Sequence, residues 1–116
     1  MALTIASREL DGVTVLDLSG RITLGEGSVQ LREAIRDLIS KGSKNILLNL
    51  GDVNYIDSSG LGELVTSFTT VRNQGGQLKL MNLNKHVHNL LQITKLYTIF
   101  EVVEDEDSAV ASFQQA

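Results

Sequence analysis

An apolar run, followed by a polar corner and an amphipathic helix, constrains the fold of this chain more than any other feature. The run 45–50 reads Asn-Ile-Leu-Leu-Asn-Leu and is typical of a buried strand. After it, the segment 57–62 reads Asp-Ser-Ser-Gly-Leu-Gly and opens a stretch in which apolar residues recur at helical spacing. The recurring residues are Leu61, Leu64, Val65, Phe68 and Val71. This succession predicts an open α/β sheet, in which functional groups gather where strands end and helices begin.

Asp57 is the expected N-cap of this helix, because its carboxylate can accept hydrogen bonds from the free N–H groups of the first turn. This assignment places Ile56 and Leu61 at the two positions of a hydrophobic staple. A cap at Ser58 would instead place Gly62 at the second staple position, where it has no side chain to contribute. The spacing therefore favours Asp57.

Serines and glycines occupy the start of that helix. Ser58 and Ser59 fall at its first and second positions, where we expect their hydroxyls to be exposed. Gly60 and Gly62 are poor helix formers, which indicates that small side chains are needed there. Close approach of a partner protein would explain both glycines.

Strand-like and helix-like segments alternate along the rest of the chain. Asp11-Gly12 between two β-prone runs predicts a hairpin, and Lys41-Gly42 predicts the end of a helix with an apolar stripe at 31–39. Strands are expected at 3–9, 13–18, 45–50, 77–83 and 99–103, and further helices at 58–73, 85–93 and 108–113. This alternation predicts parallel strand pairs joined by right-handed crossovers, with the hairpin as an antiparallel edge.

Length and composition exclude several classes of protein. A chain of 116 residues suits one domain with one core. It has no cysteine and no apolar stretch near the about 18 residues of a membrane span, and no signal peptide is visible at its start. We therefore expect a cytoplasmic protein without disulfides or a membrane partner. Because the net charge is −4 and lysine and arginine form no cluster, nucleic-acid binding is not expected.

The sequence predicts no catalytic, metal or cofactor site. A serine hydrolase would need a histidine base, and Ser58 is not flanked by the glycines of a nucleophile elbow. The histidines, His86 and His88, are two residues apart on a predicted helix and so point to different faces. The glycines at 25–27 and 60–62 match no phosphate-binding loop. The acidic residues near the C-terminus lack calcium-ligand spacing and are expected to form a solvated patch: Glu101, Glu104, Asp105, Glu106 and Asp107.

Residues 46–50 and 53–62 together resemble the core signature of STAS domains, in particular that of the bacterial anti-sigma factor antagonists. The similarity extends over nearly the whole chain and includes the opening hairpin, Leu18-Ser19-Gly20 and the segment 73–80. The resemblance implies a single STAS domain over residues 1–116. Its fold class is α/β, with a mixed, mostly parallel β-sheet, an N-terminal antiparallel hairpin and α-helices.

The resemblance also implies a site. In this family the serine directly after the aspartate is phosphorylated; here it is Ser58, with Ser59 as a secondary candidate. The implied partner surface includes the loop expected at 18–23 and the residues Asp57, Ser58, Ser59, Gly60, Leu61 and Gly62. Many members carry acidic residues where this chain has Arg21 and Thr23, and this departure leaves the identity of the partner open.

The function implied by the resemblance is that of an anti-sigma factor antagonist, a phosphorylation-switched binding module that regulates transcription. Unphosphorylated, such a protein binds an anti-sigma factor that is also a serine kinase, and a sigma factor is released. A metal-dependent serine phosphatase resets the cycle. The antagonist itself is no enzyme and uses no cofactor. Two alternatives stay open: a STAS module of another signalling assembly, such as a stressosome-type scaffold, and a small-ligand-binding domain.

Overall fold

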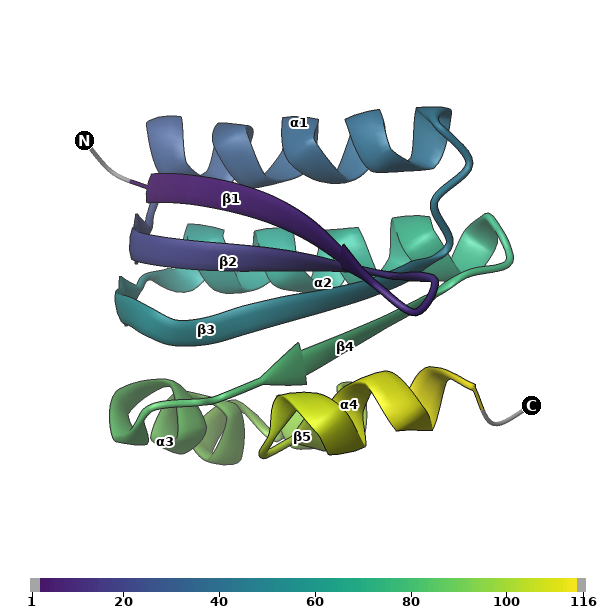
Figure 1. The fold of residues 1–116 in the computed structure, drawn as a ribbon. Coiled ribbons are helices and arrows are strands. Elements are labelled where there is room, and N and C mark those ends of the chain that lie inside the picture. The colour runs from purple at the N-terminus through teal and green to yellow at the C-terminus, as the bar shows by residue number, and fades with distance from the viewer. Residues whose placement is uncertain (1–2, 115–116) are drawn as a thin grey trace.

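The computed structural model describes residues 3–114, which form one mixed β-sheet with helices on both faces (Figure 1). The sheet contains five strands in the order β1-β2-β3-β4-β5: Leu3–Leu10, Val13–Ile22, Asn45–Ile56, Gln77–Met81 and Val102–Val103. β1 pairs antiparallel with β2, and every later pair is parallel. The predicted α/β fold, a mostly parallel sheet with an N-terminal hairpin, is confirmed.

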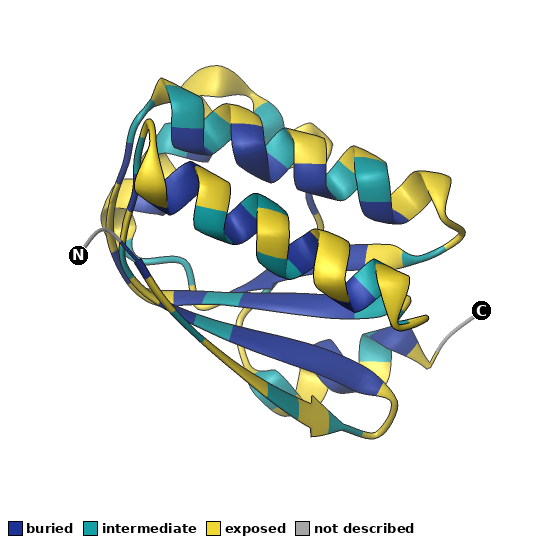
Figure 2. Cartoon of the chain, turned by 90° about the horizontal axis from the view of Figure 1, so that it is seen from above, coloured by how far each residue is buried: buried dark blue, intermediate teal, exposed yellow. Residues whose placement is uncertain are grey.

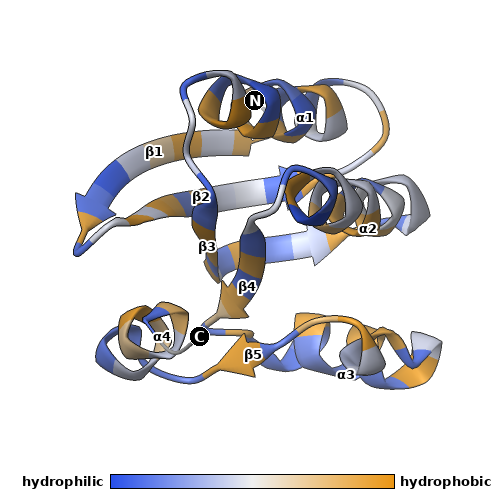
Figure 3. Ribbon diagram, turned by 90° about the vertical axis from the view of Figure 1, so that its right-hand side faces the viewer, coloured by the Kyte–Doolittle hydropathy of each residue, from blue (hydrophilic) through white to orange (hydrophobic). Residues whose placement is uncertain are grey.

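The sheet separates the hydrophobic core into two parts, and four helices within residues 3–114 cover its two faces. They are α1 (Glu26–Ser40), α2 (Ser58–Asn73), α3 (Lys85–Thr94) and α4 (Glu106–Phe113), with a short 3₁₀ helix at Leu96–Thr98. α1, α2 and α3 contribute to a larger cluster on one face of the sheet, whereas α4 packs against a smaller cluster on the opposite face (Figure 3). Burial on both faces explains the apolar runs of the central strands β2 and β3.

α1 and α2 each bury one stripe of side chains and expose the other side (Figure 2). In α1 the buried stripe includes Leu31, Ile35 and Leu38, and in α2 it includes Leu64 and Val71. Each such side chain contributes about 1.5–3 kcal/mol relative to exposure, so the stripes fix both helices on the sheet. No helix within residues 3–114 is long and apolar enough to span a bilayer.

Local signals in the sequence correctly predicted the hairpin turn and two helix ends. Asp11 and Gly12 both have positive φ, 50° and 81°, as a two-residue type I′ turn requires. α2 spans Ser58–Asn73, which is the predicted range. α1 ends at Ser40, and Gly42 follows in the left-handed conformation (φ 86°) that is common after helices.

β2 and β3 run further than predicted, to Ile22 instead of residue 18 and to Ile56 instead of residue 50. The stretch 51–56 has apolar or aromatic residues at 53, 55 and 56 and so lacks the strict alternation of a strand. It nevertheless pairs with β2, across two register shifts. β2 supplies backbone hydrogen bonds to β3, and a local sequence pattern cannot predict them. The register shifts also break the two-residue repeat of buried and exposed side chains from which strands are predicted.

The C-terminal part of the sheet is shorter than predicted. β4 ends at Met81, not at residue 83, because Asn82 adopts a left-handed conformation (φ 59°). The predicted strand 99–103 is reduced to Val102–Val103, since the chain before it turns as a 3₁₀ helix in which the Leu96 carbonyl accepts two hydrogen bonds. α4 begins at Glu106 instead of residue 108.

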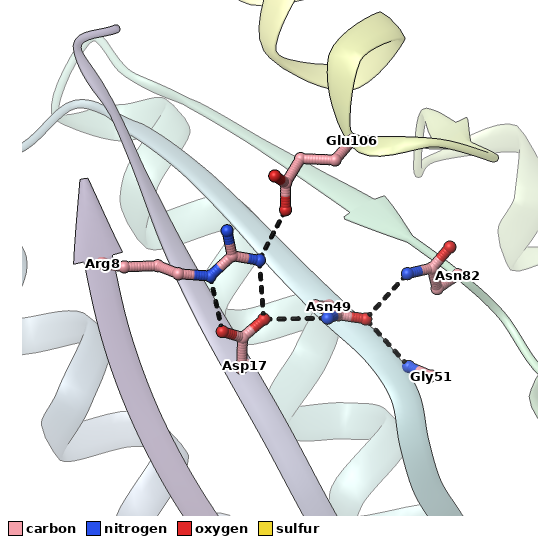
Figure 4. A network of polar contacts seen from close by, with 6 residues as sticks. All are labelled: Arg8, Asp17, Asn49, Gly51, Asn82 and Glu106. Carbon is pink, nitrogen blue, oxygen red and sulfur yellow. Dashed lines mark hydrogen bonds and ion pairs between the residues drawn. The ribbon is translucent and has the colours of Figure 1, made fainter. Parts of the chain in front are cut away.

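A polar network ties α4 to the sheet (Figure 4). Arg8 in β1 donates to both carboxylate oxygens of Asp17 in β2 (2.7 and 3.1 Å) and to Glu106 in α4 (2.5 Å). Asn49 in β3 donates to Asp17 (2.8 Å) and accepts from Asn82 (3.2 Å). The hydrogen bond from Arg8 is the main cause that holds the pKa of Asp17 below its ordinary value.

Four of the five acidic residues near the C-terminus are exposed, as the predicted solvated patch requires, and Glu106 is half-buried. Glu106 belongs to the network just described. Glu101 pairs with the buried Lys79 (3.1 Å), and Asp105 caps α4 by accepting from the Ser108 N–H (2.8 Å). The contact of Glu106 depends on the packing of α4 against the sheet, and that of Glu101 on the position of β4, so the acidic run alone does not predict either contact.

Candidate functional site

The C-terminal ends of β2 and β3 bring two separate segments together at the start of α2. We call this region the α2 corner: residues 57–62 with the loop 23–25 that follows β2. Ile22 and Ile56 pair in the sheet, and the Asp57 N–H donates to the Ile22 carbonyl (3.3 Å). The corner therefore lies where parallel strands end, the usual place of functional groups in open α/β sheets.

Asp57 holds the corner together with both oxygens of its carboxylate. Oδ1 accepts from the Gly60 N–H (2.8 Å), which confirms Asp57 as the N-cap of α2. Oδ2 accepts from the Leu24 N–H (3.0 Å), in the loop after β2. The bonds from Leu24 and then Gly60 hold the pKa of Asp57 below its ordinary value, because they stabilise the charged form. One side chain thus begins α2 and fixes the neighbouring loop.

Ser58 and Ser59 occupy the first two positions of α2, as predicted. Ser58 is exposed and Ser59 is half-buried. Within residues 3–114 no hydrogen bond joins either hydroxyl to His86 or His88, the bases that a serine hydrolase would need. A free hydroxyl at a helix N-terminus is open to a kinase, and the positive end of the helix favours an added phosphate.

Gly60 and Gly62 have different roles, so the prediction that a partner explains both is wrong for Gly60. A Cβ at Gly60 would lie 1.9 Å from the carbonyl oxygen of Ile22, so this glycine lets α2 approach β2 within the chain. A Cβ at Gly62 would meet nothing within 4 Å. Ile56 is buried in the larger core and Leu61 packs against that core, while the predicted staple contact between the two stays a prediction.

Arg21 lies beside the α2 corner and Thr23 lies within it, although residues 18–22 of the predicted loop 18–23 belong to β2. Arg21 is part of β2 and pairs with Tyr55 of β3. Thr23 begins the true loop, and its carbonyl accepts from the N–H (3.1 Å) and the hydroxyl (2.8 Å) of Ser28 in α1. The loop is therefore fixed at Thr23 by Ser28 and at Leu24 by Asp57.

Three exposed residues near the corner were missed by sequence reasoning: Leu24, Tyr55 and His86. Leu24 is 77 % exposed, and an apolar residue in an otherwise polar loop is the signal that could have found it. The ring of Tyr55 stacks on that of His86 at the start of α3, with centroids 5.7 Å apart. Arg21 lies over the Tyr55 ring, 5.2 Å from its centroid. No local pattern indicates that these three elements meet.

The two histidines do not form a common site. His86 stacks on Tyr55, whereas His88 lines a separate cavity of about 320 Å³ with Tyr97 and Phe100. Residues two apart on α3 point to different faces, as their spacing predicts. Within residues 3–114 no group of three or more histidine, aspartate or glutamate side chains is arranged to hold a metal ion.

Substituting Asp57 by asparagine should weaken the pH dependence of stability in the acid range. Because folding lowers the pKa of Asp57 below 3.8, the stabilisation by its charge is complete above that pH and is lost as the pH falls through the folded value. We expect the difference in melting temperature between wild type and Asp57→Asn to shrink from about pH 7 to about pH 3. Asp52→Asn, at an exposed position of the same sheet edge, controls for removal of a charge. A constant difference across this range would contradict the assignment.

Comparison with known proteins identifies the family. The STAS domain model matches residues 4–109. The anti-sigma-B factor antagonist of Bacillus subtilis is 32 % identical over 110 residues, which cover 95 % of this chain and 99 % of that protein. The anti-sigma F factor antagonist of Paenibacillus polymyxa is 28 % identical, over 98 % of this chain and 97 % of its own. An anti-sigma factor antagonist from Mycobacterium paratuberculosis shares the fold, with a TM-score of 0.83 at 19 % identity over 98 % of this chain and 96 % of that one. The chain, with this sheet and this capped corner, belongs to the STAS domain family.

Proposed function

We propose that the chain is an anti-sigma factor antagonist whose binding to an anti-sigma factor is switched by phosphorylation of Ser58. The observation that carries the proposal is the exposed Ser58 at the first position of α2, in a corner that Asp57 holds in one arrangement. The names of the two relatives support the class of partner. The proposal takes residues 1–116 as one STAS domain.

The α2 corner has the properties of a preformed docking surface. Because Asp57 already ties the loop to the helix, little conformational entropy is lost when a partner binds. Gly62 leaves open space on the first turns of α2, and Leu24 offers an exposed apolar side chain beside it. Apolar groups rimmed by polar ones are typical of protein contacts. We assign the partner surface to residues 57–62 together with Arg21 and Thr23.

In the proposed cycle the unphosphorylated protein binds an anti-sigma factor that is also a serine kinase, and the sigma factor is released. The kinase transfers the γ-phosphoryl group of ATP to the Ser58 hydroxyl, and the complex dissociates. A metal-dependent serine phosphatase removes the phosphate. The protein is ligand and substrate in this cycle and not its catalyst, and the cycle operates in the cytoplasm.

We expect the kinase partner to phosphorylate Ser58. The Ser58→Ala protein serves as bait in the native lysate, because it can bind the kinase but cannot be released by phosphorylation. The captured kinase is then incubated with wild-type protein and ATP, and the phosphate is located by mass spectrometry. We expect one phosphate per chain on Ser58, and an unchanged yield with Ser59→Ala as the matched control.

Three outcomes would count against this proposal. Stoichiometric phosphate on another residue, with Ser58 unmodified, would overturn the assignment of the site. Failure of Ser58→Ala to retain any ATP-binding anti-sigma factor would favour a STAS module of another signalling assembly. A shift of the melting temperature by small metabolites in the absence of a protein partner would favour the ligand-binding alternative.

A further inference from the structure

Three side chains from three elements form a cluster at the sheet edge next to the α2 corner. Arg21 comes from β2, Tyr55 from β3 and His86 from the start of α3. The guanidinium lies 5.2 Å from the centroid of the Tyr55 ring, and the Tyr55 and His86 rings are nearly parallel, at 18°. We call these residues the Arg21–Tyr55–His86 cluster. All three are exposed.

The stability of the fold does not account for the cluster. Tyr55 keeps 41 % of its surface in water although it is a large aromatic residue. Lys85 and His86 are the first two residues of α3, and no acidic residue lies in that turn. The positive end of the helix dipole disfavours cations at these positions, so basic residues there weaken the helix slightly. Basic and aromatic residues that contact one another and are exposed together indicate an interaction surface.

The charge of the cluster is opposite to that of the whole chain, which has a net charge of −4. Arg21 takes part in none of the ion pairs within residues 3–114, whose cations are Arg8, Arg32, Lys41 and Lys79. Contact with Tyr55 holds the guanidinium in place, and its N–H groups stay available. A guanidinium held in this way fits a carboxylate with two parallel hydrogen bonds.

The carboxylates at the same edge do not neutralise Arg21. Asp57 uses its two oxygens to accept from Gly60 and Leu24. Asp52 is exposed in β3 and forms no ion pair within residues 3–114. An acidic partner is therefore attracted to the Arg21–Tyr55–His86 cluster, although the chain as a whole is acidic.

We propose that the Arg21–Tyr55–His86 cluster binds an acidic segment of the protein partner, with a carboxylate seated on Arg21. The identity of that partner as an anti-sigma factor rests on the proposed function. The surface is continuous with the α2 corner, because Arg21 pairs with Tyr55 directly before Ile22 pairs with Ile56. A phosphate on Ser58 then adds negative charge to an edge that the carboxylates of the partner approach, which favours dissociation.

The first arm of the test uses a hexaglutamate peptide and needs no kinase. Amide and side-chain NMR signals of the wild-type protein are followed during the titration at low salt. We expect saturable shifts centred on the Arg21–Tyr55–His86 cluster, their loss in Arg21→Glu, and no such shifts with a hexalysine peptide. Arg36→Glu is the matched control, because Arg36 is an exposed arginine of α1 that takes part in no ion pair within residues 3–114.

The second arm uses the captured kinase. Arg21→Glu should weaken its binding about tenfold, with the melting temperature of the protein unchanged, since charge reversal turns an attraction into a repulsion. Tyr55→Ala should also weaken binding although it removes no charge, and Tyr55→Phe should preserve it. Equal effects of Arg21→Glu and Arg36→Glu, or shifts by hexaglutamate centred elsewhere, would overturn the proposal. Because the peptide arm is independent of any kinase, its failure and a failure to find phosphate on Ser58 are distinguishable.

Discussion

Replacing Gly60 by alanine should strongly destabilise the domain. The added Cβ would lie 1.9 Å from the Ile22 carbonyl oxygen and 2.7 Å from the Ile22 carbonyl carbon. These are backbone atoms of a central strand, so they cannot rotate away, and α2 must instead lift off β2. Overpacking of a core costs about 1–3 kcal/mol and occasionally more. We expect about 3 kcal/mol or more, which lowers the melting temperature by about 10 °C or more in a domain of this size.

Gly62→Ala is the matched control, two residues further along the same helix. A Cβ at Gly62 would meet nothing within 4 Å, and the residue is exposed. Alanine is favoured over glycine inside a helix by about 0.8–1 kcal/mol, so this variant should melt at a slightly higher temperature than wild type. Equal melting temperatures for the two variants, in thermal unfolding followed by circular dichroism, would show that α2 does not approach β2 as closely as described.

The contrast between these glycines shows what the sequence can and cannot predict. Both residues look alike in the segment 57–62, and both suggested a need for small side chains. The reason for Gly60 lies in Ile22, which is distant in the sequence and meets it only in the folded chain. The N-cap Asp57 and the start of α2 could be predicted, because capping depends on residues within one turn.

Contacts between residues distant in the sequence explain the other differences between the predicted and the observed structure. The extension of β3 to Ile56 depends on β2, and β5 pairs with β4 over only two residues because the chain before it turns at the 3₁₀ helix Leu96–Thr98. The contacts of Arg8 with Asp17 and Glu106 join residues 9 and 98 positions apart. The position of Ser58 could be predicted for the same local reason as the cap, whereas the contact of Tyr55 with His86 could not.

Ser58→Asp should fold normally and bind the kinase about a hundredfold more weakly than wild type, while Ser58→Ala should bind well and not be released. At the first position of α2, a phosphate adds roughly −1.5 to −2 charges. The positive end of the helix favours that charge by about 0.3–1 kcal/mol. The carboxylate of Asp57 next to it opposes the charge, and both effects are screened because the site is exposed. The two effects oppose each other, so the fold should change little.

A partner responds differently to the same charge. The surface of the partner must either remove water from the phosphate or face it with charged or polar groups. Burial of an unpaired charge costs far more free energy than its exposure at a helix end. The cost is greatest where the partner is acidic, as the Arg21–Tyr55–His86 cluster suggests, because like charges then face each other across the interface. The effect of phosphorylation should therefore lie in the binding free energy and not in the free energy of unfolding.

Amide NMR spectra and kinase affinity, measured on the same variants, separate this mechanism from a conformational one. Shifts caused by phosphorylation should be confined to residues around Ser58, and the melting temperature of Ser58→Asp should stay close to that of wild type. Thr69→Asp, at an exposed position further along α2, controls for the added charge and should bind the kinase as wild type does. Shifts spread over the whole sheet would mean that the phosphate changes the fold, since β2 and β3 pack against α2 through the core and do not sense a screened surface charge. NMR shifts confined to residues around Ser58, combined with loss of kinase binding, would instead show that the added charge at the α2 corner weakens binding.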